Sequence, residues 1–203
     1  KYRVNHFVCT ANAITPLAHN NYPEQYNLTC LKVFRYGGCK FPAKLLEAIR
    51  AKYGVRMYEI YGATEFMGHV STTADPELGC ERFEPGNLGP VLPNIEMKIV
   101  DLQSGQPLPV NTHGEVCFRG APSFVGYLNN EEATRSTIDA EGWYHSGDIG
   151  YYDQSGYLFV SDRIKEMIKY KMWSVIPAEI EDFLHRHEAV WAVCVVGVPH
   201  VTD

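Results

Sequence analysis

The sequence predicts an α/β fold in which a parallel strand–helix–strand unit precedes a β-rich part and a short α+β part. Three observations carry this prediction. Residues 31–61 contain an apolar run, a glycine pair, a helical pattern and a second apolar run, in that order. Short strand patterns separated by turn residues dominate 95–161. A helix pattern that begins at Pro177 follows a lysine-rich stretch, which marks the start of a different unit.

The N-terminal elements are predicted from their apolar spacing. An apolar stretch at 6–9 leads into a helical pattern at 10–19, despite Pro16. A strand at 31–36, a helix that begins at Pro42 and a strand at 55–61 then form a unit of a parallel sheet. Such sheets bind ligands beyond the carboxyl ends of their strands. Two segments are expected at that edge: Gly37-Gly38 and Gly62-Ala63-Thr64-Glu65.

The β-rich part is expected to form a small antiparallel barrel or sheet. Its strands are predicted at 95–100, 115–119 and 124–128, with one or two helical turns at 131–138. A hairpin is predicted to join 149–152 to 157–161. After the helix at Pro177, whose inner face carries Ile180, Phe183 and Leu184, a final buried strand is expected at 190–198.

Composition excludes several classes of function. The 203 residues carry a net charge of -6, which disfavours binding to nucleic acid or to acidic membrane surfaces. The six cysteines form no C-x-x-C pair, which is typical of reduced thiols in an intracellular protein. No apolar run approaches the roughly 20 residues of a transmembrane helix, and the first residues lack the pattern of a signal peptide. The compartment, peroxisomal or cytoplasmic, and the oligomeric state stay open.

Four clusters offer the groups that a nucleotide site needs, and each also has a purely structural interpretation. Gly37-Gly38 lets backbone approach a flat ligand, or simply forms a turn. Residues 61–65 offer an aromatic ring, a hydroxyl and a carboxylate suited to Mg²⁺, or form a strand-to-loop corner. Asp148 either accepts ribose hydroxyls or caps a turn. Arg163 either binds ribose or phosphate, or pairs with Asp162 or Glu166. Exposed lysines follow it: Lys165, Lys169 and Lys171.

Several longer motifs occur together and in a fixed order. They are Tyr-Gly-x-Thr-Glu at 61–65, Gly-Glu-Val-Cys-Phe-Arg-Gly at 114–120, Trp-Tyr-His-Ser-Gly-Asp at 143–148 and Asp-Arg-Ile-Lys-Glu-Met-Ile-Lys-Tyr-Lys at 162–171. Over the whole chain they resemble the adenylate-forming enzymes, and most closely the acyl-CoA synthetases related to 4-coumarate:CoA ligase and firefly luciferase. The resemblance implies the C-terminal part of a large adenylating domain. Its expected parts are the end of the α/β AMP-binding domain (1–84), a β-rich subdomain (85–161), and a hinge with the start of a mobile C-terminal domain (162–203).

The resemblance also implies a reaction and a set of site residues. A small-molecule carboxylate, fatty or aryl-propenoic, attacks the α-phosphate of ATP, and the thiol of coenzyme A then takes the acyl group from AMP. The catalytic residues would be Thr64 at the α-phosphate, Glu65 holding Mg²⁺, and Lys169 in the second step. The cofactor-binding residues would be Gly38, Cys39, Glu59, Ile60 and Tyr61 at adenine, Asp148 and Arg163 at ribose, Lys165 at the hinge, and Lys171 with Met172. Phe7, Thr10, Phe66 and His69 are candidates for the acyl pocket or for plain packing.

Departures from the family pattern keep alternatives open. Met172 stands where the family has glycine, and Glu59-Ile60 replaces the usual Gln-Gly. Cys39-Lys40 replaces Ala-Pro. The family's phosphate loop and adenylation lysine are expected to lie outside this chain, so the chain is predicted to be an inactive segment of the longer enzyme. The alternatives are a catalytically weakened paralogue that binds nucleotide or fatty acid and, ranked lower, a luciferase-type monooxygenase.

Overall fold

The computed structural model describes residues 3–20, 22, 26–38, 41, 43–73, 86–170, 173–187, 189–190 and 193–199. The chain divides into two compact units. The first consists of Lys1–Ile95, Gly120–Val125 and Gly156–Leu158, and the second of Glu96–Arg119, Gly126–Ser155 and Phe159–Asp203. The three-part domain division predicted from the sequence stays a prediction.

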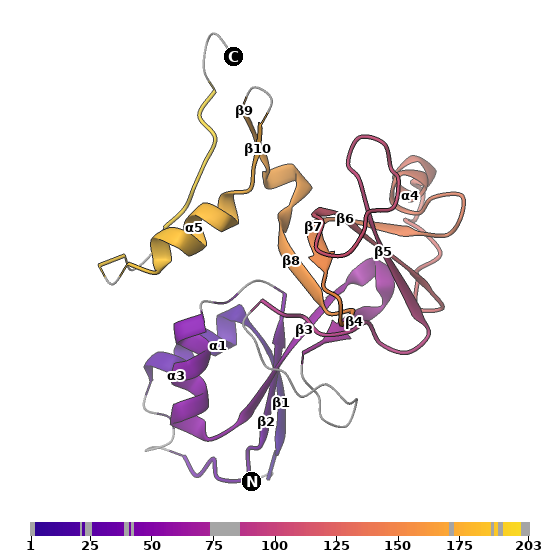
Figure 1. Cartoon of the computed structure of the whole chain (residues 1–203). Coiled ribbons are helices and arrows are strands. Elements are labelled where there is room, and N and C mark those ends of the chain that lie inside the picture. The colour runs from indigo at the N-terminus through magenta and orange to yellow at the C-terminus, as the bar shows by residue number, and fades with distance from the viewer. Residues whose placement is uncertain are drawn as a thin grey trace. The chain divides into compact units, whose positions relative to one another are not determined.

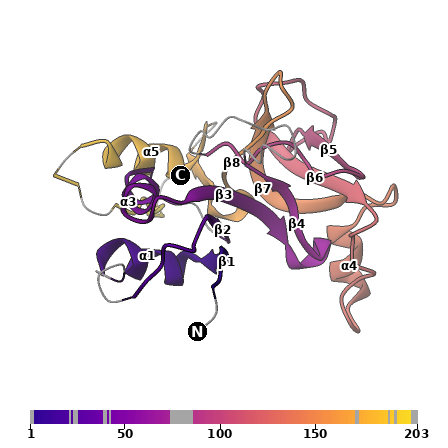
Figure 2. The same ribbon diagram turned by 90° about the horizontal axis from the view of Figure 1, so that it is seen from below.

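The first unit contains a four-stranded sheet of order β1-β2-β3-β4. Strands β1 (His6–Thr10), β2 (Val33–Gly37) and β3 (Arg56–Ala63) run parallel, and β4 (Gly68–Thr72) pairs antiparallel with β3. Helices α1 (Ala11–His19) and α3 (Ala43–Tyr53) lie side by side on one face of the sheet, as Figures 1 and 2 show. The predicted parallel α/β unit is thereby confirmed.

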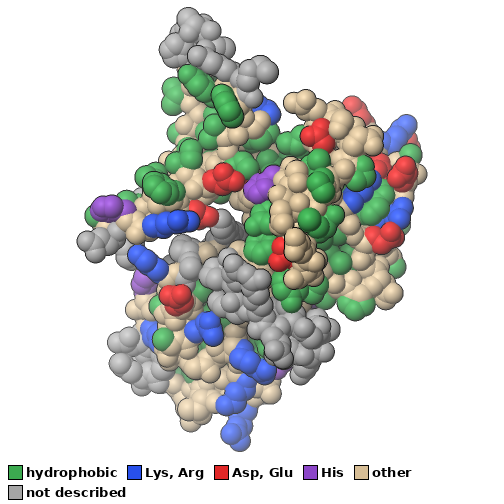
Figure 3. Space-filling view, in the orientation of Figure 1, with side chains coloured by type: hydrophobic (Ala, Val, Ile, Leu, Met, Phe, Trp, Pro, Cys, Tyr) green, Lys and Arg blue, Asp and Glu red, His purple; other side chains and the backbone are tan. Residues whose placement is uncertain are grey.

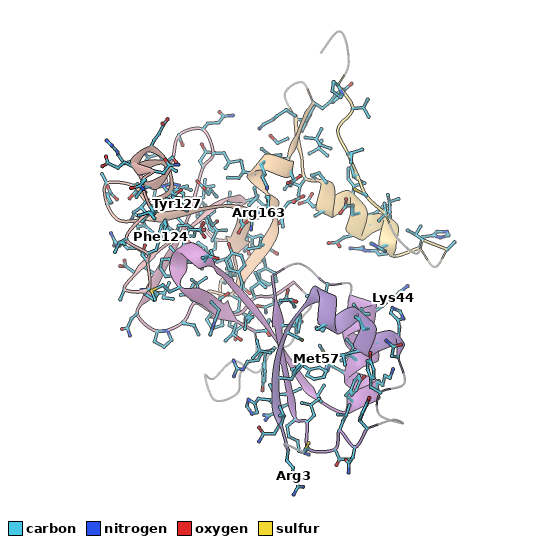
Figure 4. All side chains as sticks on the ribbon, turned by 180° about the vertical axis from the view of Figure 1, so that it is seen from behind. Arg3, Lys44, Met57, Phe124, Tyr127 and Arg163 are labelled. Atoms are coloured by element: carbon cyan, nitrogen blue, oxygen red, sulfur yellow. The ribbon has the colours of Figure 1, made fainter. Side chains whose placement is uncertain are left out.

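Both helices of the first unit pack on the sheet through one apolar core. Alternating residues of β2, Phe34 and Tyr36, face this core, as does Met57 of β3, which is labelled in Figure 4. Ile14 from α1 and the α3 residues Leu46 and Ile49 complete it, all nearly inaccessible to solvent. The core therefore covers one face of the sheet, and the carboxyl ends of β1, β2 and β3 lie together at one edge of it.

The second unit contains a sheet of strand order β5-β6-β7-β8, in which β6 and β7 pair antiparallel. Its strands are β5 (Ile95–Val100), β6 (Gly114–Gly120), β7 (Tyr144–Tyr152) and β8 (Leu158–Arg163). Helix α4 (Glu131–Thr137) begins after Asn130, whose side chain accepts the N–H of Ala133. Within the described ranges the sheet is open, with β5 and β8 as its edges, so the predicted α/β class is confirmed but barrel closure is not seen.

The last part of the second unit is a short strand pair followed by a helix. The 3-10 turn Ile164–Glu166 leads into β9 (Ile168–Tyr170), which pairs antiparallel with β10 (Trp173–Val175). Helix α5 (Pro177–His185) has proline at its start, as predicted. Hydrophobic side chains gather over α5 and the β9–β10 pair in Figure 3, and those with large exposed areas include Trp173, Phe183 and Val196.

Two predicted strands are wrong. Residues 124–128 form no strand, because the N–H of Phe124 donates to the carbonyl of Glu65 and Gly126 has a positive φ. The described residues between 190 and 199 also form no strand, and Val198 is 83% exposed rather than buried. Among the described helices none has the length and apolar character needed to cross a bilayer.

Candidate functional site

The carboxyl edge of the first sheet carries an open cavity of about 600 Å³. The parallel register places Thr10 beside Gly37, and Gly37 beside Ile60, so three strand ends meet there. The edge is the place where parallel sheets bind ligands. The cavity is lined by Val8, Cys9, Thr10, Gly37, Gly38, Ile60, Gly62, Ala63, Thr64, Met67, Gly68 and His69.

The turn after β3 brings a hydroxyl to this cavity. Residues Thr64–Phe66 form one 3-10 turn, which ends at Met67 in a left-handed conformation with φ 51°. Phe66 is buried and anchors the turn, whereas Thr64 is exposed and lines the cavity. Glu65 is half-buried, and its carbonyl accepts the N–H of Phe124. The packing of Phe66 thus leaves the hydroxyl of its neighbour Thr64 at the cavity wall.

Of the residues predicted for adenine that the structure describes, only some face the cavity. Gly38 and Ile60 line it, whereas Glu59 and Tyr61 do not, because adjacent strand residues point to opposite faces of the sheet. Glu65 also lies outside the lining set. Three further predicted site residues lie outside the described part of the chain: Cys39, Lys171 and Met172.

Glu59 is directed toward the core of the first unit. It is 7% exposed, and the Tyr36 hydroxyl donates to its Oε2 at 3.3 Å. Its backbone is held to Thr73 by two hydrogen bonds: the N–H of Glu59 donates to Thr73 Oγ1 at 2.7 Å, and the N–H of Thr73 donates to the Glu59 carbonyl at 2.9 Å. Burial, and then the charge of Glu59, raise the pKa of Tyr36 well above its usual value. The tyrosine therefore stays a neutral donor to this carboxylate.

In the second unit, the structure brings Asp148 and Arg163 together. Asp148 lies on β7 and is 5% exposed, whereas Arg163 ends β8 and is labelled in Figure 4. Arg163 Nε lies 2.8 Å from Asp148 Oδ1. Asp162 instead accepts the N–H of Ala178 at the start of α5, at 3.1 Å. The pairing of Arg163 with Asp148 confirms neither ribose binding nor a capping role, but it places the two predicted residues in contact.

The predicted lysines that the structure describes lie in the following segment and are exposed. Lys169 on β9 donates from Nζ to the Ser174 hydroxyl on β10 at 2.7 Å. Lys165 Nζ lies 3.8 Å from Glu166 Oε1, and both side chains are mostly exposed. Such exposed contacts contribute little to stability, so these ammonium groups can exchange partners at low cost.

Residues 1–128 match the family model described as AMP-binding enzyme. The chain belongs to the AMP-binding enzyme family. Its relatives include 4-coumarate–CoA ligase-like 1 of Arabidopsis thaliana, 40% identical over 97% of the chain and 38% of the relative. 4-coumarate–CoA ligase 1 of Glycine max is 41% identical over 94% of the chain and 67% of that relative. A luciferin 4-monooxygenase of Luciola mingrelica is 37% identical over 95% of the chain and 35% of its own length.

Solved structures of adenylating enzymes share the fold of this family member. ATP-bound MatB from Rhodopseudomonas palustris matches with a TM-score of 0.86 and 26% identity, over 98% of the chain and 39% of that protein. The anthranilate CoA ligase AuaEII in complex with anthranoyl-AMP matches with a TM-score of 0.84 and 25% identity, over 100% of the chain and 38% of that protein. The chain thus spans well under half of each of these two proteins, and 38% of the Arabidopsis relative.

The structure brings together one cluster of polar side chains to which the sequence assigns no role. Glu115, Cys117 and His145 place one ligand-type atom each within 4.8 Å of one another in the second unit. The glutamate and cysteine lie in the motif at 114–120, and the histidine lies in the motif at 143–148. The signal that could have found them is that both motifs carry polar residues on strands that pair in the sheet. Only the register of β6 on β7 reveals the contact.

Proposed function

We propose that this chain is a segment of an ATP-dependent acyl-CoA synthetase, which makes an acyl-adenylate and then transfers the acyl group to coenzyme A. The observation that carries the proposal is the contact of Asp148 with Arg163, at 2.8 Å, between residues of two separate motifs. A buried carboxylate beside a guanidinium is a suitable acceptor for the hydroxyls of a ribose. The cavity in the first unit, with Thr64 on its wall, supports the same proposal.

The first step needs donors and positive charge near the α-phosphate, because negative charge develops there as pyrophosphate leaves. The hydroxyl of Thr64, exposed at the cavity, is the proposed donor. Glu65 is the proposed Mg²⁺ ligand, and a single half-buried carboxylate fits an ion that also takes phosphate oxygens and water. When bound, the ion would neutralise phosphate charge. Gly38 and Ile60 at the cavity, and Glu59 and Tyr61 beside them, are the proposed adenine contacts, with Cys39.

The second step uses the lysine-rich segment. We assign Lys165 to the hinge, and Lys169, Lys171 and Met172 to the surface that meets the acyl-adenylate during transfer to the coenzyme A thiol. The exposed, weakly held ammonium of Lys169 supports this assignment, because a residue that serves only one step must change partners. The acid is proposed to be fatty or aryl-propenoic, and the apolar residues of the cavity wall favour such a substrate.

A second candidate function is nucleotide or fatty-acid binding without efficient turnover. The side chain of Ile60 lies on the cavity wall where the resemblance predicts glycine, and it packs against Gly37. A branched side chain there reduces the space for a ligand. The luciferase-type reaction remains a lower alternative. The described cysteines are free thiols, which supports the predicted intracellular location, cytoplasmic or peroxisomal.

The test is pyrophosphate release by the longer protein that carries this chain. It is assayed over a panel of fatty and hydroxycinnamic acids, with and without coenzyme A. We expect release that depends on one acid class, rises with coenzyme A, and is lost in Asp148→Ala. ATP binding without release on any acid would refute the ligase and favour the second candidate, in which case Ile60→Gly should restore turnover. The isolated chain is expected to release no pyrophosphate in the same assay.

A further inference from the structure

We infer that Glu115, acting with His145, is the positioning residue that fixes Asp148 for the ribose of the nucleotide. The inference rests on the proposed function, since it concerns how that site is held. Asp148 itself would touch the ribose, whereas Glu115 would act only through the backbone that carries Asp148. All the groups involved belong to the second unit.

The strand that carries Asp148 is irregular at this point. In the pairing of β6 with β7, Glu115 lies opposite Ile149, but Cys117 lies opposite His145, so β7 has two additional residues between these pairs. The irregular stretch of β7 therefore consists of Ser146, Gly147 and Asp148. Gly147 has a φ of +71°, a conformation that suits glycine. A bulge of this kind redirects a side chain out of the regular alternation of a strand.

Hydrogen bonds of two side chains, those of Glu115 and Ser146, hold the bulge. Glu115 Oε1 accepts the N–H of Gly147 at 3.1 Å, and Glu115 Oε2 lies 2.8 Å from His145 Nδ1. The Ser146 hydroxyl donates to the carbonyl of Val116 at 2.7 Å and accepts the N–H of Asp148 at 3.0 Å. Glu115 thus contacts His145, just before the bulge, and Gly147 at its centre, one residue before Asp148.

A second carboxylate keeps the histidine ring in place. His145 Nε2 lies 3.6 Å from Asp139 Oδ2, so the ring spans two carboxylates from different elements. Asp139 is itself fixed, because its Oδ1 accepts the N–H groups of Trp143 and Glu141. Burial raises the pKa of Asp139, but these N–H groups, Lys98 and His145 together lower it below its usual value, which keeps it an acceptor. We call Glu115, His145 and Asp139 together the clamp; their contacts hold it in place before any ligand arrives.

The same atoms suggest a metal site, and the contacts favour the hydrogen-bonded interpretation. The distance of 2.8 Å between His145 Nδ1 and Glu115 Oε2 is that of a direct hydrogen bond. The other oxygen of Glu115 is already engaged with Gly147. Cys117 Sγ lies farther from His145 Nδ1, at 3.5 Å, and this nitrogen is already engaged by Glu115.

The experiment compares ATP with 2′-deoxy-ATP and 3′-deoxy-ATP in the longer protein that carries this chain. A charged acceptor for a hydroxyl contributes enough free energy for the wild type to prefer ATP by roughly tenfold or more in kcat/KM. In Glu115→Ala this preference should fall to about twofold, with an unchanged KM for the acid, because Asp148 is no longer held in position to accept the ribose hydroxyls. Glu115→Gln, which keeps an acceptor for Gly147, should recover part of it. Asp148→Asn is the positive control, and Glu96→Ala, on the neighbouring strand β5, is the matched control that should keep the full preference.

Two results separate the inference from the function. An active wild type in which Asp148→Asn loses the preference while Glu115→Ala keeps it overturns the inference alone. A wild type without turnover on any acid refutes the proposed function, and calorimetry of AMP against 3′-deoxy-AMP then tests the clamp by binding: equal affinities in the wild type overturn the inference too. A metal site would explain two other results. The preference for ATP would then be lost in Cys117→Ala, or lost after dialysis against a chelator and return of Mg²⁺, and either result would overturn the hydrogen-bonded clamp.

Discussion

Replacing Gly62 by alanine should destabilise the first unit strongly, even though alanine normally favours the folded state over glycine. Gly62 pairs with His69 in the antiparallel ladder of β3 and β4. A methyl group at Gly62 would overlap the carbonyl oxygen of Gly68 and lie 2.5 Å from His69 Cα. Both obstacles are backbone atoms, which a side-chain rotation cannot move. The strands must separate or the bulge next to Gly62 must rearrange.

The magnitude follows from the overlap. Carbon atoms pack at about 3.5 to 4.0 Å, so β4, which carries His69, must move away from Gly62 by about 1 Å or more. This displacement strains or breaks the hydrogen bonds near the Gly62 and Ala63 pairs, each worth about 0.5 to 1.5 kcal/mol. Overpacking adds about 1 to 3 kcal/mol. We therefore expect a loss of about 3 kcal/mol, offset slightly by the gain of about 0.4 to 1 kcal/mol from the less flexible unfolded chain.

Urea unfolding followed by far-UV circular dichroism measures this loss directly. The matched control is Gly197→Ala, where the new methyl would meet only side-chain atoms of Ile168, at 3.3 Å or more, and where φ is not positive. The control should change the free energy of unfolding by less than about 1 kcal/mol. If Gly62→Ala proves no more destabilising than Gly197→Ala, the steric account of this glycine is wrong.

Two further changes should alter stability. Because burial raises the pKa of Cys117 from 9.0 to about 12, the unfolded chain loses this proton first, and stability should fall from about pH 9 upward by at most about 1.4 kcal/mol per pH unit. Urea midpoints between pH 8 and about 10.5 measure the slope, and an equal slope in Cys117→Ala would contradict this origin. Asn130→Ala should cost about 1 kcal/mol, because it removes the acceptor for the N–H of Ala133 at the start of α4. Thermal melts that place Asn130→Ala level with the surface control Glu132→Ala would refute the capping role.

The sequence predicts most elements of this fold because their apolar spacing is local. The helices at 11–19 and 43–53 and the parallel strands at 6–10, 33–37 and 56–63 are found where the periodicity places them, to within about two residues at each end. Strand β4 cannot be predicted in this way, because Gly-His-Val-Ser-Thr is short and has no clear apolar alternation. The turn before it also depends on Met67 in a left-handed conformation that methionine seldom adopts. A strand also needs a partner. The strand predicted at 190–198 is not formed in the described residues, and the N–H of Val195 donates instead to the carboxylate of Glu181.

In the candidate site, too, local motifs can be predicted from the sequence, whereas contacts between distant residues cannot. Asp148 and Arg163 can be proposed from their motifs, and the structure adds that they touch. The clamp cannot be found from spacing, because Glu115 is 30 residues from His145 in the chain and meets it only through the register of β6 and β7. The sequence places Gly62 at the ligand-binding edge of the sheet, and the structure shows it in the cavity lining. The structure adds a packing reason for this glycine, because the carbonyl of Gly68 occupies the space that a side chain would need.

Both proposed ligand-binding turns lie at interruptions of an antiparallel ladder. The pairing of β3 with β4 shifts between Tyr61 and Gly62, just before Thr64, and the pairing of β6 with β7 shifts beside Asp148. A regular strand would alternate its side chains between two faces and could not present consecutive residues to one ligand. The glycines of these two motifs permit the irregular backbone, and the hydroxyl and carboxylate use the direction it creates. A substitution that regularised either ladder should therefore abolish ligand contact while leaving every proposed functional side chain in the sequence.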